Sequence, residues 1–268
     1  MKKEFKQYLI NQNLSKNTIN SYLFTLNQIH KMYDISYLTK KKLLDYKMFL
    51  IENYRPQTVN LRIRGVNCYL ESIQKENLRL TAIKVQSKNY LENVISEADY
   101  EYLKRKLRKN DKFWYFVIRF MAATGARVSE LIQIKVEHIK IGYFDLYSKG
   151  GKLRRIYIPI KLQVEALKWF EEKNILSGFI FLNRYGERIT PRGIAGQLKI
   201  IANKYGIDKK VVYPHSFRHR FAKNFLSKFN DISLLADLMG HESIETTRIY
   251  LRRTSTEQQK IVNEVIDW

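Results

Sequence analysis

The sequence predicts a mainly helical protein with one small antiparallel β-sheet, organised as an N-terminal helical domain followed by a larger α+β domain. Over roughly the first 80 residues, apolar side chains recur at the three- and four-residue spacing of amphipathic helices. Further along, two runs rich in Ile, Tyr and Phe flank Gly150-Gly151, which is typical of a β-hairpin. The rest of the chain again shows helical spacing, interrupted by capping residues and glycines.

Four helices are expected in the N-terminal domain. Ser15 is placed to cap the second helix and Thr39 the third, because both hydroxyls precede an apolar periodic stretch. Pro56 suits the first turn of the fourth helix, where its missing N–H costs nothing.

A domain boundary is expected after the fourth helix. The helical periodicity is lost between Leu80 and Leu91, and long structureless segments are uncommon inside compact domains. We therefore expect a helical domain over 1–82, a linker over 83–94 and a second domain over 95–268.

The second domain opens with Ser96 and Asp99 at the spacing of a capping box. Residues 113–135 predict one or two buried helices, interrupted at "TGAR". Strand-like runs extend from His138 to Ile160 around the glycine pair. Further helices are expected over 191–206, 214–226, 231–239 and 256–268.

The charge is strongly basic. Lys and Arg number 48 against 26 Asp and Glu, a formal net charge of +22. Residues 1–90 carry 16 Lys and Arg against 6 acids, and the remainder carries 32 against 20, so both parts are basic. Such a surplus favours a polyanionic partner, and nucleic acid is the commonest one. A merely lysine-rich soluble surface is the alternative.

Several classes of protein are disfavoured. Cys68 is the single cysteine, which rules out an internal disulfide framework and disfavours a cysteine-based zinc site. The N-terminus lacks the apolar core of a signal peptide, and the most apolar run, 113–123, is too short for a membrane span and contains Arg119. We expect a soluble, cytoplasmic protein without membrane contact.

The segment "PHSFRHRFA" places His215, Arg218 and His219 on one helical face. This face could hold a metal, form an ordinary basic surface, or bind an anion. Arg218 would repel a cation and no acid or cysteine nearby supplies a third ligand, so an anion site is favoured. The Glu97/Asp99 pair could likewise bind a metal, but acids in a first helical turn usually complement the helix dipole. Neither a metal nor a cofactor is expected.

Three further segments carry residues suited to phosphate chemistry. In "MAATGARVSELIQI", Gly125 allows a turn after which Arg127 opens a helix. Glu130 is spaced to orient that arginine. The tip "SKGGK" could present a lysine as a proton donor. "LMGHESIETTRIYL" supplies His241 and Tyr250.

Together these side chains fit displacement at a phosphodiester. Arginines can neutralise the non-bridging oxygens, histidines can donate or shuttle protons, and a lysine can protonate the leaving oxygen. A tyrosine phenol becomes an effective nucleophile only where cations stabilise its anion. Neither a Walker-A loop nor a convincing carboxylate cluster for two-metal chemistry is present in the sequence.

At this point the chain resembles the tyrosine recombinase/integrase family, and its Xer-like branch in particular. "ATGARVSELIQI" is similar to the family's first arginine box, "PHSFRHRFA" to its H-x-x-R box and "LLADLMGHESIETTRIY" to the box that ends in the nucleophile. Their order and the hairpin lysine between them also fit, and the likeness covers essentially the whole chain. Ser148 departs from the glycine expected before that lysine.

The resemblance implies roles for individual residues. Arg127 and Arg218 would clamp the scissile phosphate, and Tyr250 would attack it to give a 3′-phosphotyrosyl link. Lys149 would be the general acid, with Lys152 the less favoured choice. A second set would assist: His215 as a proton acceptor or donor, His241 as a phosphate ligand, His219 and Glu130 as structural supports.

The resemblance also implies an architecture and an assembly. A SAM-like four-helix domain and the catalytic domain would clamp double-stranded DNA at short inverted-repeat core sites. Four protomers would exchange strands through a Holliday junction. An apolar stripe on the last helix would dock on a neighbouring protomer, or alternatively on its own domain: Ile261, Val262, Val265 and Ile266. A paralogous recombinase or a regulatory partner is a further alternative.

The absence of an extra arm-binding domain and the short segment after Tyr250 favour a simple Xer-like or resolvase-type enzyme that acts on short core sites. An Xer-like role in chromosome or plasmid dimer resolution at cell division is preferred. The alternatives are an integrase or resolvase of a mobile element, a type IB topoisomerase-like enzyme, and a DNA-binding protein that has lost catalysis. Lys152, Arg192 and Arg220 are candidates for DNA contact.

Overall fold

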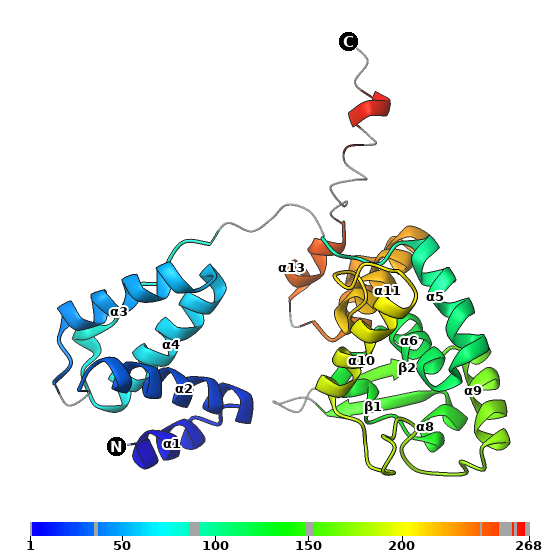
Figure 1. Ribbon diagram of the computed structural model, residues 1–268, viewed down its shortest axis with the longest axis horizontal. Coiled ribbons are helices and arrows are strands. Elements are labelled where there is room, and N and C mark those ends of the chain that lie inside the picture. Colours follow the sequence, from blue (N-terminus) through cyan, green and yellow to red (C-terminus); the bar gives the residue numbers. More distant parts are fainter. Residues whose placement is uncertain are drawn as a thin grey trace. The chain divides into compact units, whose positions relative to one another are not determined.

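The computed structural model confirms a mainly helical chain with a small two-stranded antiparallel sheet (Figure 1). It divides into two compact units, Met1–Ser87 and Lys88–Trp268, which are described separately. Within the described part of the chain, no helix is long and apolar enough to cross a membrane. The structure describes residues 2–34, 37–85, 92–147, 153–241, 243–251, 259 and 262–265.

The first unit is built from four helices whose apolar faces meet in one core. Ser15 and Thr39 accept hydrogen bonds from the backbone N–H groups three residues on, and Pro56 stands in the first turn of α4, so the predicted helix starts are confirmed. Helix α4 packs against α1, α2 and α3. The helices are α1 (Lys2–Asn11), α2 (Lys16–Met32), α3 (Lys40–Asn53) and α4 (Pro56–Ser72).

Two asparagines of α4 hold the extended chain that follows the short 3₁₀ turn η2 (Glu76–Leu78). The amide of Asn67 donates to the carbonyl of Leu80 and accepts from its N–H, both at 2.8 Å. Asn60 makes the same pair of bonds to Ile83 at 2.9 Å. Each amide satisfies a backbone donor and an acceptor at once, so the non-helical chain up to Ile83 is fixed to the first unit.

The second unit has a large core around α6, which packs against α5 and α11 (Figure 1). Ser96 caps α5, with its Oγ accepting from the N–H of Asp99, but the Asp99 carboxylate bonds to that same Oγ and not to the backbone N–H that a capping box uses. The buried serine Ser216 of α11 accepts from the N–H of Ile95 at 2.8 Å and so fixes the chain entering α5. The elements before the hairpin are α5 (Glu97–Asn110), α6 (Lys112–Thr124), α7 (Val128–Leu131) and α8 (Val136–Ile141). Those after it are α9 (Ile160–Glu172), α10 (Pro191–Lys204), α11 (Pro214–Lys228), α12 (Ile232–Met239), α13 (Ile244–Thr247) and the 3₁₀ turn η3 (Arg248–Leu251).

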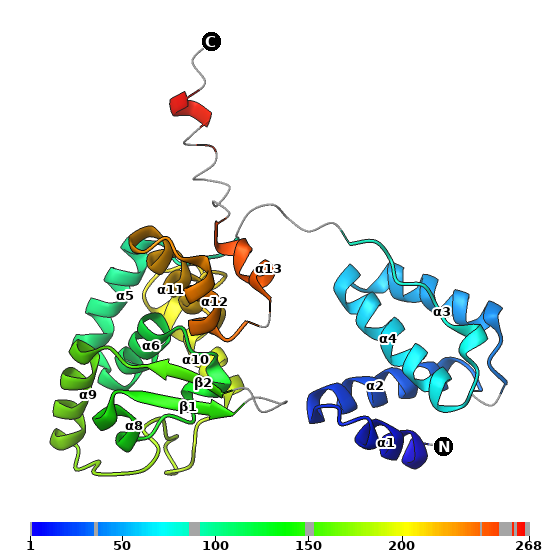
Figure 2. The same cartoon turned by 180° about the vertical axis from the view of Figure 1, so that it is seen from behind.

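The predicted hairpin consists of β1 (Tyr143–Tyr147) and β2 (Leu153–Tyr157), with α8 and α9 beside it and α12 against β2 (Figure 2). The expectation of strand from His138 onward was wrong, because 136–141 form α8. The imidazole of His138 accepts the N–H of Lys135 at the start of this helix, and Gly142 ends it at φ +88°. Helix α9 was not among the expected elements, although four of its apolar residues form one buried face: Leu162, Ala166, Trp169 and Phe170.

Two glycines in the left-handed conformation end the helices that lead into the basic segments. Gly125 follows α6 at φ +63° and Gly240 follows α12 at φ +61°. A Cβ on Gly125 would lie 2.5 Å from the ring of Phe221, and one on Gly240 would lie 2.3 Å from Cδ of Arg154. Both turns therefore need glycine for conformation and for space.

Candidate active site

Arg218 of α11 is the most deeply buried basic residue of the site, at 3% exposure. Its Nη1 donates to the carbonyl of Gly125 at 2.5 Å, and its Nη2 donates to the carbonyl of Met239 at 2.6 Å. Nη2 also lies 3.0 Å from Nε2 of His241. The guanidinium therefore joins the ends of α6 and α12, and its plane is fixed from three directions.

Arg127 stands at the start of α7, where the sequence predicted it, and Glu130 orients it as expected. One carboxylate oxygen of Glu130 accepts the backbone N–H of Arg127 at 2.7 Å, and the other accepts its Nη1 at 2.8 Å. Nη2 of Arg127 donates to the carbonyl of Gly240 at 3.1 Å. The side chain is 37% exposed, so this arginine presents its face to solvent.

The carboxyl end of α12 holds three arginines. The consecutive carbonyls of residues 238–240 accept hydrogen bonds from Arg154, Arg218 and Arg127, in that order. Carbonyls at a helix C-terminus lack partners within the helix and carry the negative end of the helix dipole, so they attract guanidinium groups. This helix end brings together residues that are far apart in the sequence.

His241 follows directly and is held in one tautomer. Because Arg218 can only donate, Nε2 of His241 accepts, and Nδ1 must carry the proton that is directed at Thr247 Oγ1, 2.8 Å away. Burial, reinforced by the charges of Arg218, Arg127 and Arg154, lowers the pKa of His241 to about 4. The imidazole is therefore neutral at physiological pH and has no free N–H for a phosphate in this state.

Tyr250 of η3 is brought to the same place, but it is buried at 6% exposure. Its ring stacks on His241, with centroids 6.2 Å apart, and lies 5.4 Å from the ring of His219. Burial raises the pKa of the phenol, while the neighbouring charge of Arg218 and a hydrogen bond with it act in the opposite direction. The phenol is therefore protonated in this conformation, and one arginine already favours its anion.

The two histidines of α11 differ in environment. His215 is exposed at the surface, but its imidazole is partly desolvated. This desolvation, together with the charges of Arg218 and Arg127, lowers the pKa of His215. His219 lies between His215 and Tyr250, and its Nδ1 is buried with no hydrogen-bond partner. Burial lowers the pKa of His219 to about 4. Both imidazoles are available as neutral groups.

The described part of this site contains three guanidinium groups, those of Arg127, Arg154 and Arg218, against the single carboxylate of Glu130. Burial would raise the pKa of Glu130, but Arg154 and Arg127 outweigh it, so the pKa is lowered and the acid stays ionised. Burial and the two neighbouring arginines lower the pKa of Arg218 to about 10. Two positive charges thus remain for an anion.

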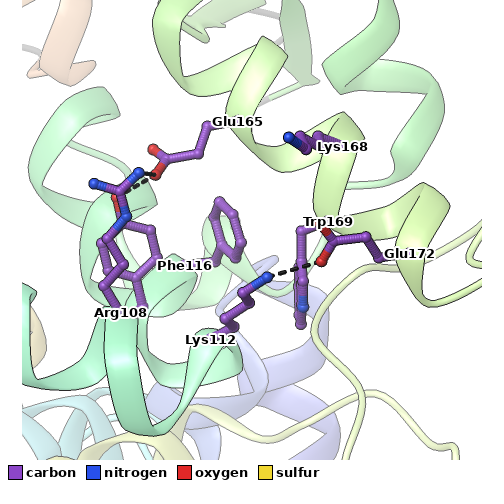
Figure 3. Close-up of a pocket in the computed structure, with 8 residues that line it drawn as sticks. Arg108, Lys112, Phe116, Glu165, Lys168, Trp169 and Glu172 are labelled. Atoms are coloured by element: carbon purple, nitrogen blue, oxygen red, sulfur yellow. Dashed lines mark hydrogen bonds and ion pairs between the residues drawn. The ribbon is translucent and has the colours of Figure 1, made fainter.

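A cleft of about 580 Å³ opens between the hairpin and α12, with Arg127, Glu130, Arg154 and His241 in its walls. Figure 3 shows a second, smaller hollow of about 200 Å³ lined by residues of α5, α6 and α9. Ion pairs between Lys112 and Glu172 and between Arg108 and Glu165 lie in its sides, and its lining contains none of the site arginines or histidines.

Both lysines of the hairpin tip, Lys149 and Lys152, lie outside the described residues. The same holds for Ile261 and Ile266 of the apolar C-terminal stripe. Val262 and Val265 of that stripe are described and are exposed.

The DNA-contact candidates Arg192 and Arg220 differ. Arg192 is exposed in the first turn of α10. Arg220 is 7% exposed, bonds to Glu97 at 2.7 Å and lies 4.1 Å above the ring of Tyr100. The charge of Arg220 is therefore used inside the unit, which favours Arg192 over Arg220 as a DNA contact.

The paired acids of α5 also have partners within the protein. Glu97 binds Arg220, and Asp99 accepts from Ser96 Oγ at 2.8 Å. Among the residues that the structure describes, no group of three or more His, Cys, Asp or Glu could hold a metal ion.

Arg154 was not among the residues expected from the sequence. It lies in β2, is 9% exposed, and donates to Glu130 at 2.6 Å and to the carbonyl of Leu238 at 2.9 and 3.1 Å. The strand pattern could have indicated this. Arg154 is two residues before the buried Ile156 and so lies on the same face of the strand, while Arg155 lies on the other face and pairs with Asp145.

Known proteins resemble the chain in sequence over nearly its whole length. A model described as the phage integrase family matches residues 85–257. The tyrosine recombinase XerA of Pyrococcus furiosus is 30% identical over 267 residues, which cover 97% of this chain and 91% of that protein. The tyrosine recombinase XerD of Vibrio cholerae is 26% identical over 280 residues, covering 94% of this chain and 90% of its own.

The fold agrees with these matches. The crystal structure of the XerH site-specific recombinase bound to difH in a pre-cleavage complex superposes with a TM-score of 0.71 at 20% identity, covering 94% of this chain and 80% of that one. Together with the sequence matches, this places the chain in the phage integrase family, as a tyrosine recombinase of the Xer type, the class of enzyme that cleaves and rejoins DNA.

Proposed function

We propose that the chain is a site-specific recombinase that cuts double-stranded DNA at short inverted-repeat core sites through a 3′-phosphotyrosyl link to Tyr250. The observation that carries this proposal is the convergence of Arg127, Arg218, His241 and Tyr250, from α7, α11 and the segment after α12, on the carboxyl end of one helix. The net charge of +22 supports DNA as the partner.

Arg127 and Arg218 clamp the scissile phosphate. Arg127 is partly exposed beside the cleft, so its free donors can reach a non-bridging oxygen. Arg218 is buried and fixed, so its role is to supply charge at a set position. The two positive charges left after pairing with Glu130 match the two negative charges of the pentacoordinate phosphorane, so the site favours the transition state over the singly charged diester.

Tyr250 attacks the phosphorus after leaving its packing against His241 and His219. As the O–P bond forms and the bond to the 5′-oxygen breaks, the phenol proton passes to His215, which is neutral and exposed. Lys149 protonates the departing 5′-oxygen, and Lys152 is the less favoured choice. Rejoining reverses these steps with the 5′-hydroxyl of a partner strand, so no ATP or metal is required.

His241 changes partner when DNA binds. In the free protein its Nε2 accepts from Arg218. An adjacent phosphate stabilises the imidazolium and raises its pKa, so Nε2 gains a proton and donates to the phosphate. His241 thus orients Arg218 before binding and becomes a phosphate ligand afterwards.

The test is covalent trapping on DNA. A target, called the selected site below, is first recovered by binding wild-type protein to a randomised duplex library. The selected site is then nicked just downstream of each candidate scissile phosphate in turn, so that the short 5′-hydroxyl fragment diffuses away after cleavage. Wild-type protein should form a covalent adduct with the 5′-labelled strand, and Tyr250→Phe should form none while keeping DNA affinity.

Tyr213→Phe is the matched control, because Tyr213 is another phenol near Tyr250. It should form the adduct normally. An adduct with Tyr250→Phe, or its loss only in Tyr213→Phe, would contradict the assignment of the nucleophile. No adduct with wild type would favour a DNA-binding protein that has lost catalysis.

Assembly is proposed on the same basis. Four protomers exchange strands in pairs through a Holliday junction, and the exposed Val262 and Val265 support docking of the C-terminal segment on a neighbour. Two selected sites on one plasmid should give recombinant product. Relaxation of supercoils without recombinants would indicate a type IB topoisomerase-like enzyme instead.

The biological task that we propose is chromosome or plasmid dimer resolution in the cytoplasm. The full-length similarity to XerA and XerD proteins supports this assignment over integration of a mobile element. A paralogous recombinase or a regulatory partner would show itself as a requirement for a second protein in the two-site assay.

A further inference from the structure

We propose that Arg154 is a positioning residue that holds the phosphate clamp in its working geometry, a role that rests on the proposed function. None of the hydrogen bonds described for Arg154 is to Tyr250. Instead it bonds to Glu130 and to the carbonyl of Leu238 with three N–H groups, all within 3.1 Å.

Arg154 controls Arg127 through a shared carboxylate. Oε1 of Glu130 accepts from Nη1 of Arg127 at 2.8 Å and from Nη1 of Arg154 at 2.6 Å. Without Arg154, Glu130 is free to rotate toward Arg127 alone and to neutralise it more completely. The exposed donors of Arg127 would then shift, and less net positive charge would face the phosphate.

Arg154 also fixes the helix end that carries the rest of the site. Its contact with Leu238 lies next to the carbonyl of Met239, which holds Arg218, and its Cδ fills the space above Gly240. A shift of this helix end would move Arg218 and His241 together. A displacement of about 1 Å in a catalytic array costs roughly 100-fold in rate.

The burial of Arg154 argues against a role as a plain surface cation. The Arg154 side chain is only 9% exposed, so its guanidinium has lost most of its hydration. Neutralising Glu130 does not explain this burial, because Arg127 already pairs with that carboxylate. The next residue, Arg155, makes an ordinary cross-strand pair with Asp145 at 2.8 Å and is 38% exposed. The two arginines therefore provide a matched comparison within one strand.

The experiment compares Arg154→Gln, Arg154→Lys and the control Arg155→Gln by single-turnover cleavage of the nicked selected site at saturating protein. Three versions of the scissile position are used: the normal phosphate, a neutral methylphosphonate, and a phosphate with a bridging 5′-sulfur that needs no general acid. Melting temperature and DNA affinity are measured for each protein.

We expect Arg154→Gln to cleave the normal phosphate about 100-fold more slowly than wild type, and Arg154→Lys about 10-fold more slowly, because lysine keeps the charge but cannot bridge both partners. The deficit should shrink to less than about 10-fold on the methylphosphonate, where the charge that the clamp neutralises is absent. It should persist with the bridging sulfur. Arg155→Gln should match wild type on all three substrates.

Other outcomes overturn the proposal. Equal deficits on all three substrates would mean general damage to the fold, and rescue by the bridging sulfur would mean that Arg154 acts on the leaving group. Wild-type rates on the normal phosphate would mean that it does not position the clamp. If Arg154→Gln does not fold, Arg154→Lys carries the same comparison. Failure of wild-type protein to form an adduct on any substrate would overturn the proposed function instead, so the two failures are distinguishable.

Discussion

Replacing Gly240 with alanine should damage the site more than the conformation of the glycine alone accounts for. Gly206, which lies just beyond the end of α10, has a nearly identical φ of +67° against +61° for Gly240. A Cβ on Gly206 meets nothing within 4 Å, whereas one on Gly240 lies 2.3 Å from Cδ and 2.8 Å from Nε of Arg154. Comparing Gly206→Ala with Gly240→Ala therefore separates the cost of the left-handed conformation from the cost of the steric clash with Arg154.

The magnitudes follow from these contacts. Alanine in the left-handed conformation costs about 1 kcal/mol, which both variants share. In Gly240→Ala the middle of the Arg154 side chain must also move by about 1 Å, and its guanidinium cannot then keep its bonds to both Glu130 and Leu238. Loss of one charge-assisted hydrogen bond adds about 1.5–3 kcal/mol, so we expect a total of about 2.5–4 kcal/mol.

Urea unfolding gives the stability, and covalent trapping on the selected site gives the activity. Gly206→Ala should lose about 1 kcal/mol and keep its cleavage rate, whereas Gly240→Ala should lose about 2.5–4 kcal/mol and cleave about 100-fold more slowly. In an Arg154→Ala background the extra cost of Gly240→Ala should vanish, leaving about 1 kcal/mol. Equal losses for Gly206→Ala and Gly240→Ala, or additivity in the double variant, would refute the reasoning.

Three further predictions concern stability. Burial lowers the pKa of His219 to about 4, so the unfolded chain takes up its proton first as the pH falls. The free energy of unfolding should therefore fall from pH 7 to pH 5, by at most about 2 kcal/mol from this residue, and urea titrations of His219→Gln should show a shallower fall. Ser216→Ala should cost about 1–3 kcal/mol in urea unfolding because it leaves a buried N–H without an acceptor, whereas the exposed Ser227→Ala should stay within about 0.5 kcal/mol. Asn67→Ala should release both bonds to Leu80, and hydrogen exchange at the Leu80 amide should rise by at least about 10-fold while amides in α2 stay protected.

Local rules predicted much of the fold because the relevant signals are local. Ser15, Thr39 and Ser96 cap the helices they precede, and Gly125 and Gly240 end the helices they follow. Helix α8 was mistaken for strand because its residues are rich in Ile and Val. The features that bound this helix are not apolar: His138 accepts the N–H of Lys135 at its start, and the left-handed Gly142 ends it.

The residues of the site could be predicted from the sequence, but their arrangement in space could not. Arg127, Arg218, His241 and Tyr250 were predicted as a group because each belongs to a motif of known order. Their arrangement around the end of α12 is a tertiary feature, and it depends on backbone carbonyls, which carry no sequence information. The role of Arg154 was not predicted for the same reason, since its partners are a carboxylate from α7 and a main-chain oxygen from α12.

The asparagine clamps of α4 have a consequence for where the first unit ends along the chain. Ile83 is bonded to Asn60 and Ile95 is bonded to Ser216, so each unit holds its own part of the chain on one side of residues 84–94. Neither bond involves a residue of that segment. A proteolytic cut within 84–94 should therefore leave both hydrogen bonds and the core of each unit intact.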